Sequence, residues 1–193
     1  MKLLDGMQKQ DGVKVSGSRV EIPDCTRSDL PQLFVDLGFK VGAEIGVENG
    51  YFSEELLKAG LELYSIDPWI HNPRWRYQRT QNAMDAIYES AKARLAPYPG
   101  SKIIRKMSMD AVQDFKDESL DFVYIDGNHE FRYVAEDLVE WTQKVKKGGI
   151  VSGHDYALNK KGARDPYVLQ VKYVLHAFVQ AFGVKTLYIL GRK

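Results

Sequence analysis

Short apolar runs alternate with longer stretches of helical spacing along most of the chain. An apolar run bounded by turn residues is typical of a buried strand, and apolar positions three and four apart predict an amphipathic helix. The runs that predict strands cover residues 41–47, 62–66, 102–105, 120–125, 150–152 and 186–190. The stretches that predict helices cover residues 29–37, 51–59, 74–96, 109–115, 168–182 and a segment from Phe131 that ends in the Lys146–Gly149 sequence, with basic residues and a glycine stop. A small hairpin turning at Ser16-Gly17-Ser18 is also expected over residues 13–22.

This alternation predicts a single α/β domain. Strand–helix–strand units with short connections form a mostly parallel, doubly wound sheet with helices on both faces, which makes a three-layer sandwich. Residues 1–37 are expected to form an N-terminal extension and helix, residues 38–193 the core, and residues 69–98 a helical insertion that is a candidate lid. Ligands bind such sheets outside the carboxyl ends of the strands, so polar residues at those ends carry the functional interpretation.

The end of the first core strand combines an acid with a glycine turn. Residues 41–50 place Glu44 inside an apolar run and follow it with Gly46 and Gly50. Glycine lets the backbone approach a ligand closely, and the helix that follows offers unpaired N–H groups. The next apolar run ends in Asp67, where a carboxylate can accept hydrogen bonds from two ribose hydroxyls. These features predict a nucleoside site.

The spacing of the turn fits a dinucleotide poorly. Glu48 stands where the second glycine of a Gly-x-Gly-x-x-Gly sequence would lie. Glu44 and Glu48 together would repel a pyrophosphate, whereas a cationic or zwitterionic ligand would meet no such repulsion. The turn therefore favours an adenosyl sulfonium over NAD.

Four motifs at the predicted strand ends extend this interpretation. They are Glu44-x-Gly46-x-x-x-Gly50, Ser65-Ile66-Asp67-Pro68-Trp69, Val123-Tyr124-Ile125-Asp126-Gly127-Asn128-His129 and Gly148-Gly149-Ile150-Val151-Ser152-Gly153-His154-Asp155-Tyr156. With them the chain resembles class I S-adenosylmethionine-dependent methyltransferases over roughly residues 38–160, and most closely the small bacterial branch with an Ile-Asp-Gly-x-His signature. The resemblance implies a Rossmann-like fold, S-adenosyl-L-methionine as cofactor, and methyl transfer to a small-molecule acceptor, with oxygen as the expected methylated atom.

The resemblance also implies a set of residues that bind the cofactor. These are Glu44, Gly46, Glu48, Gly50, Asp67, Trp69, Ser108 and Asp126. Five of them have a structural alternative, which for Asp67 is a role in the fold alone. Glu44 would then be a buried hydrogen-bond partner, Trp69 a core residue, Ser108 the cap of the short helix at Met109, and Asp126 the cap of the helix that follows it.

Asp126 and Asp155 follow neighbouring strands, which lie about 4.8 Å apart in a sheet. Their resemblance to the acids that hold Mg²⁺ in related enzymes makes them candidate ligands for a divalent cation, Mg²⁺ or Mn²⁺. His154 stands where some of these relatives carry a second acid, and histidine suits softer ions better than Mg²⁺. The alternative is a metal-free site in which His129 or His154 removes the acceptor proton with Asp126 beside it, and His129 is preferred because its position in the motif faces the pocket in the family.

Composition and charge narrow the partners. The chain has 193 residues, 27 basic and 26 acidic side chains and a formal net charge of +1, which gives no reason to expect nucleic acid or a membrane as partner. The single cysteine, Cys25, excludes an internal disulfide, so a cytoplasmic location is expected. Arg74, Arg76 and Arg79 follow the second core strand and suggest an anionic or sugar-like acceptor.

Two alternatives of other kinds stay open, an NAD-dependent oxidoreductase and a non-catalytic nucleoside-binding module on the same fold. The resemblance implies a final antiparallel strand pair, but the sequence offers only one candidate strand near the C-terminal residues. An unpaired edge there would favour a homodimer.

Overall fold

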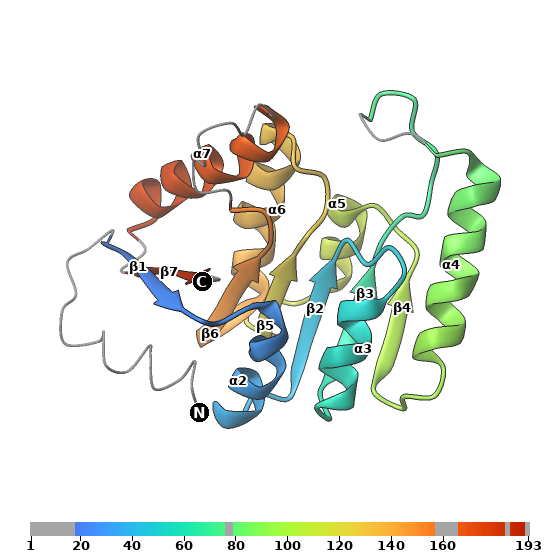
Figure 1. Cartoon of the computed structure of the whole chain (residues 1–193), viewed down its shortest axis with the longest axis horizontal. Helices are drawn as coiled ribbons and strands as arrows, with labels where there is room; N and C mark the ends of the chain where they lie inside the picture. Colours follow the sequence, from blue (N-terminus) through green and yellow to red (C-terminus); the bar gives the residue numbers. More distant parts are fainter. Residues whose placement is uncertain (1–17, 76–78, 157–165, 184–185, 192–193) are drawn as a thin grey trace.

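The computed structural model describes residues 18–75, 79–156, 166–183 and 186–191, with side chains omitted at 18–23, 166–169 and 186–191. Its centre is a sheet of five parallel strands in the order β4-β3-β2-β5-β6 (Figure 1). The strands are β2 (Val41–Ile45), β3 (Glu62–Ile66), β4 (Ser101–Ile104), β5 (Leu120–Ile125) and β6 (Val145–Gly153). The order reverses between β2 and β5, and their carboxyl ends are therefore the expected place for a ligand.

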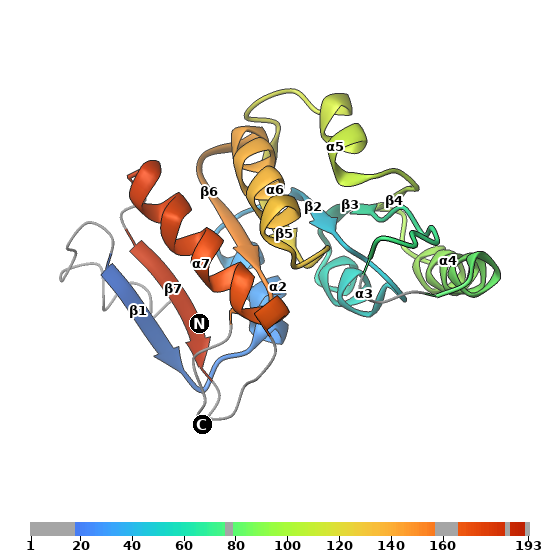
Figure 2. The ribbon, with the colours of Figure 1, turned by 90° about the horizontal axis from the view of Figure 1, so that it is seen from above.

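Helices cover both faces of this sheet, as Figure 2 shows from above. One face carries α2 (Leu30–Asp36), α3 (Tyr51–Lys58) and α4 (Gln81–Leu95), and the other carries α5 (Ser108–Ala111) and α6 (Phe131–Lys144). Short 3₁₀ helices, η2 (Arg27–Asp29) and η3 (Val112–Asp114), adjoin α2 and α5. The predicted Rossmann-like three-layer sandwich is confirmed.

Side chains of β5 show how the sheet is buried on both faces. Phe122 and Tyr124 pack among residues of α2 and α3, whereas Val123 packs on the other face with Trp141 of α6. Successive strand residues point to opposite faces, so an apolar run such as Leu120–Ile125 fills both layers. Within the described ranges, no helix combines the length and apolar character that crossing a membrane requires.

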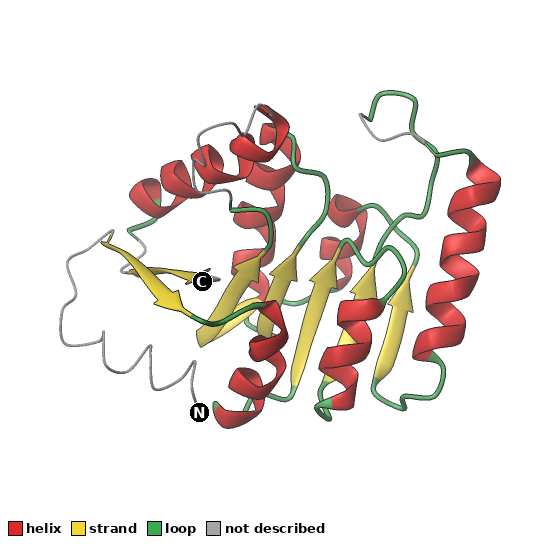
Figure 3. Ribbon diagram, in the orientation of Figure 1, coloured by secondary structure: helices red, strands yellow, loops and turns green. Residues whose placement is uncertain are grey.

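The first and last described strands pair with each other outside the central sheet. β1 (Ser18–Pro23) pairs in parallel with β7 (Thr186–Gly191) in a two-stranded sheet, and α7 (Pro166–Ala181) packs against α6 (Figure 3). The predicted last strand is thus present, but its partner in the described part of the chain is β1. Residues 18–22 of the expected hairpin belong to β1, and residues 13–17 lie outside the described residues.

Three predicted boundaries were wrong for local reasons. The helix predicted from Arg74 starts at Gln81, because the hydroxyl of Thr80 accepts a hydrogen bond from the Ala83 N–H and caps it. The short helix predicted at 109–115 is split into α5 and η3. Strand β6 starts at Val145, before the predicted residues 150–152, because an irregularity in its pairing with β5 accommodates the glycines. The Lys146–Gly149 sequence therefore belongs to this strand and does not end α6, which stops at Lys144.

Candidate functional site

The glycine turn joins the carboxyl end of β2 to α3. Gly46 has φ +88° and Gly50 has φ +75°, a region that favours glycine. A Cβ atom on Gly46 would overlap the backbone carbonyl of Asp126. The first glycine therefore lets the end of β2 approach the end of β5 closely.

Asp67, at the end of β3, is tied to this turn. Its Oδ2 accepts hydrogen bonds from the N–H groups of Val47 and Glu48, each at 3.0 Å, and its Oδ1 accepts one from the Trp69 N–H at 2.8 Å. Burial raises the pKa of Asp67, while these backbone donors act in the opposite direction. The carboxylate therefore holds the turn and its own strand end together, and its contact with a ribose stays a prediction.

Glu44 points into the protein interior from β2. Its side chain is 2% exposed and pairs with the hydroxyl of Ser53 in α3, which in turn accepts a hydrogen bond from Ser65 of β3 at 3.1 Å. Burial raises the pKa of Glu44 to about 8. This geometry matches the buried hydrogen-bond role that the sequence left open for Glu44.

Trp69 and Arg79 contact the turn through Glu48. The Trp69 indole is fully buried, lies 5.0 Å from the ring of Tyr88 in α4, and donates its Nε1–H to the Glu48 carbonyl at 2.9 Å. The exposed Glu48 carboxylate pairs with Arg79 at 2.6 Å. Trp69 thus fills the core under α4, which is the alternative to stacking on adenine.

Ser108 is the first residue of α5, and Met107 occupies the cap position. The Ser108 hydroxyl donates a hydrogen bond to Asp137 of α6 and accepts one from the Trp141 Nε1–H at 2.8 Å. The Ser108 hydroxyl therefore links the loop after β4 to the buried Asp137 of α6. It does not form the capping hydrogen bond that the sequence left open, because Met107 occupies the cap position.

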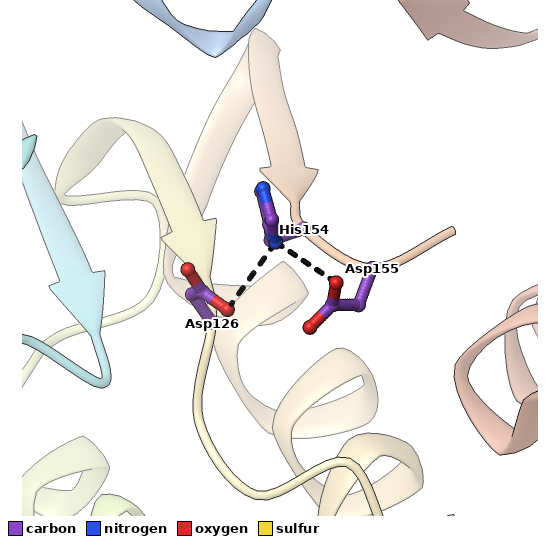
Figure 4. Close-up of side chains that lie close together, drawn as sticks. All are labelled: Asp126, His154 and Asp155. Atoms are coloured by element: carbon purple, nitrogen blue, oxygen red, sulfur yellow. Dashed lines mark ion pairs between the residues drawn. The ribbon is translucent and has the colours of Figure 1, made fainter. Parts of the chain in front are cut away.

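Two acids and two histidines meet at the ends of β5 and β6. His129 lies between the carboxylates, with its Nδ1 3.2 Å from Asp155 Oδ2 and its Nε2 3.5 Å from Asp126 Oδ1. His154 Nδ1 lies 3.1 Å from Asp155 Oδ1 and 3.9 Å from Asp126 Oδ1 (Figure 4). All four residues predicted for the acceptor side are therefore brought together, and we name them the acid–histidine cluster.

The acid–histidine cluster can hold a cation. One ligand atom each from Asp126, His154 and Asp155 lies within 4.8 Å of the others. The hydrogen bond with His154 lowers the pKa of Asp155, and the same bond raises the pKa of His154. Two carboxylates and one imidazole form a donor set that fits Mn²⁺ or another borderline ion better than Mg²⁺.

Arg27 is a member of this region that the sequence did not reveal. Its Nη1 lies 3.5 Å from Asp126 Oδ2, and its guanidinium lies 5.5 Å from the centre of the Phe52 ring in α3. The two charged residues are 99 positions apart, and no motif links them. Only the folded arrangement of η2 beside β5 brings them together.

Comparison with solved structures agrees with this fold. The chain is similar to a Staphylococcus aureus protein described as a candidate caffeoyl-CoA O-methyltransferase, with 18% identity, a TM-score of 0.60 and coverage of 94% of this chain and 83% of that one. An O-methyltransferase from Bacillus cereus, solved with S-adenosylhomocysteine, has 15% identity, a TM-score of 0.58 and coverage of 93% and 79%. The O-methyltransferase TomG from Streptomyces achromogenes, solved with S-adenosylmethionine, has 18% identity, a TM-score of 0.59 and coverage of 80% and 67%.

The sequence comparisons define the family. The uncharacterized protein y4gI of Sinorhizobium fredii is 26% identical over 102 residues, which span 52% of this chain but only 11% of that protein. The methyltransferase-domain family matches residues 43–156, which include the glycine turn, Asp67 and the whole acid–histidine cluster. The chain therefore belongs to the methyltransferase-domain family.

Proposed function

We propose that this protein transfers a methyl group from S-adenosylmethionine to a hydroxyl oxygen of a small molecule. The observation that carries the proposal is the meeting of the glycine turn, Asp67 and the acid–histidine cluster at one edge of a parallel sheet. Parallel sheets bind ligands at this edge, next to the point where the strand order reverses. Solved structures of the same fold are described as O-methyltransferases, and two of them hold the donor or its demethylated product.

The donor's adenosine would lie over the turn that contains Gly46 and Gly50. A carboxylate offers about four lone-pair positions, and three at Asp67 already accept backbone N–H groups. The free position on Oδ1 is the one available to a ribose hydroxyl. Asp67 would therefore contribute twice, by fixing the turn and by accepting one hydrogen bond from the ribose.

The acid–histidine cluster would act on the acceptor. In the transfer, the acceptor oxygen loses its proton and attacks the methyl carbon, while the carbon–sulfur bond breaks and leaves a neutral thioether. Alignment of the two reactants can supply about 7–11 kcal/mol of the barrier. A divalent cation held by Asp126, His154 and Asp155 would supply Lewis-acid chemistry at the acceptor oxygen.

His129 is the proposed base for the acceptor proton. Its ring lies between Asp126 and Asp155, so both carboxylates stabilise the imidazolium that proton uptake creates. Residues 69–98 remain a proposed lid, and one contact of the loop before α4 supports it: Trp75 donates its Nε1–H to the Tyr133 hydroxyl near the start of α6 at 3.4 Å.

Thermal unfolding tests the donor assignment. S-adenosylhomocysteine should raise the Tm of the protein, because a ligand that binds only the folded state stabilises it by mass action. NAD at the same concentration should leave the Tm unchanged. A rise with NAD alone would favour the oxidoreductase alternative, and no rise with either compound would contradict a nucleoside site altogether.

Metal titration tests the cation assignment separately. Mn²⁺ should raise the Tm of the wild-type protein more than Mg²⁺ does, and Asp155→Asn should remove most of this rise. The exposed pair of Glu89 and Lys92 provides a control, since Glu89→Gln removes an acid far from the acid–histidine cluster and should keep the response. Equal responses in wild type and Asp155→Asn would overturn the cation proposal and leave His129 acting alone.

A further inference from the structure

Arg27 is a charged residue at the site to which the proposed function gives no task. It lies in η2, just before α2, and its side chain is 40% exposed. Figure 1 shows that the segment joining β1 to α2 runs in front of the sheet beside β5 and β6. A guanidinium that retains this much exposure beside a ligand edge can still bind an anionic group.

The two carboxylate oxygens of Asp126 face different surroundings. Oδ1 is directed to His129 at 3.5 Å and His154 at 3.9 Å, whereas Oδ2 is directed to Arg27 at 3.5 Å. The Arg27 side adjoins Phe52, in the first turn of the helix that follows the glycine turn. One oxygen of Asp126 therefore faces the histidines and the other faces Arg27, and the charge of Arg27 also reaches His154 and Asp155.

The donor end of S-adenosylmethionine is a zwitterion, with an α-ammonium and an α-carboxylate on one carbon atom. Asp126 Oδ2 and the Arg27 guanidinium offer the complementary pair of charges side by side. Their separation of 3.5 Å is long for a charged hydrogen bond, which is about 2.7–2.9 Å when well formed, so the guanidinium fork keeps donors for another carboxylate.

We propose that Arg27 binds the α-carboxylate of the methyl donor, with Asp126 Oδ2 facing its α-ammonium group. The proposal rests on the proposed function and assigns a donor-binding residue outside residues 43–156, where the family match lies. An anionic group on the acceptor is the competing ligand for Arg27. The donor is favoured because Arg27 lies over the ring of Phe52, in the first turn of the helix that follows the glycine turn.

A comparison of two ligands tests this assignment. S-adenosylhomocysteine carries the α-carboxylate, and 5′-methylthioadenosine has the same adenosine and sulfur but no amino-acid end. In calorimetric titrations, Arg27→Gln should weaken S-adenosylhomocysteine binding about tenfold or more, since charged hydrogen bonds are lost. Its affinity for 5′-methylthioadenosine should stay at the wild-type value.

Two further variants complete the experiment. Arg132→Ala removes an arginine that is 79% exposed and pairs with Glu136 in the same helix, and it should change neither affinity. Arg27→Lys keeps the charge beside Asp126 without the bidentate fork, so its loss should be intermediate and still confined to S-adenosylhomocysteine.

The outcomes separate the possible failures. If Arg27→Gln lowers the affinity for both ligands equally, Arg27 is a structural counter-ion of Asp126. If it changes neither affinity, Arg27 does not bind the donor. Either result overturns the assignment. If the folded wild-type protein binds neither ligand, the proposed function itself fails and the assignment falls with it.

Discussion

Two acids are buried close to the site, and each is held by a hydroxyl group. Glu44 pairs with Ser53, and Asp137 pairs with Ser108. Burial raises the pKa of Glu44 to about 8 and that of Asp137 to about 7. Glu44 could be singled out from the sequence because it interrupts an apolar strand. Asp137 could not, because one acid within a helical pattern is normally on the solvated face.

The raised pKa of Glu44 predicts how stability depends on pH. The folded state keeps a proton that the unfolded state releases, so this contribution is complete below about pH 4.5 and is lost as the pH rises to about 8. Between pH 7 and 8 the free energy of unfolding should therefore fall, by up to about 1.4 kcal/mol per pH unit. Glu44→Gln should remove this fall in urea unfolding experiments.

Asp137→Asn is the matched control for this experiment. The pH window of Asp137 ends near pH 7, so its substitution should make the fall below pH 7 less steep, where Glu44 still contributes, and preserve the fall above pH 7. The slope, rather than the absolute stability, is the quantity to compare. Identical slopes between pH 7 and 8 in the wild type and in Glu44→Gln would contradict a protonated Glu44.

The turn between β2 and α3 shows how far a sequence motif determines an element. Its glycines and Asp67 were found from spacing alone, because their conformations and their place at strand ends follow from local rules. The hydrogen-bond partners of Asp67 could not be predicted in this way. Its bonds to Val47 and Glu48 depend on the register of β2 against β3, which only the folded sheet provides. The start of α4 was predicted wrongly for a local reason, because the hydroxyl of Thr80 caps the helix there and outweighs the apolar pattern.

Gly46→Ala tests the close approach of β2 and β5. The new Cβ would overlap the Asp126 carbonyl, whereas Gly60, with nearly the same positive φ, has open space around it. Gly60→Ala should cost about 1–2 kcal/mol for the left-handed conformation alone. Gly46→Ala should cost more and should also weaken S-adenosylhomocysteine binding, because the end of β5 must shift. Equal losses of unfolding free energy in the two variants would show that the contact is unimportant.

At the scale of the whole molecule, the strand order makes the site. Because β2, β3, β5 and β6 are parallel, residues from four motifs far apart in sequence reach one edge of the sheet. The alternation of strands and helices was enough to predict this edge, and the resemblance to methyltransferases singled out Asp126, His154 and Asp155 at it. Arg27 and the pairing of β1 with β7 could not be predicted, since they depend on how the chain before the core folds back on it.

A crystal structure with S-adenosylhomocysteine and Mn²⁺ bound is the most direct test. We expect the adenosine over the turn at Gly46 and Gly50, a ribose hydroxyl within hydrogen-bond distance of Asp67, and anomalous scattering from manganese among Asp126, His154 and Asp155. Density for the nucleoside away from this strand edge, with Asp67 out of reach of the ribose, would contradict the account.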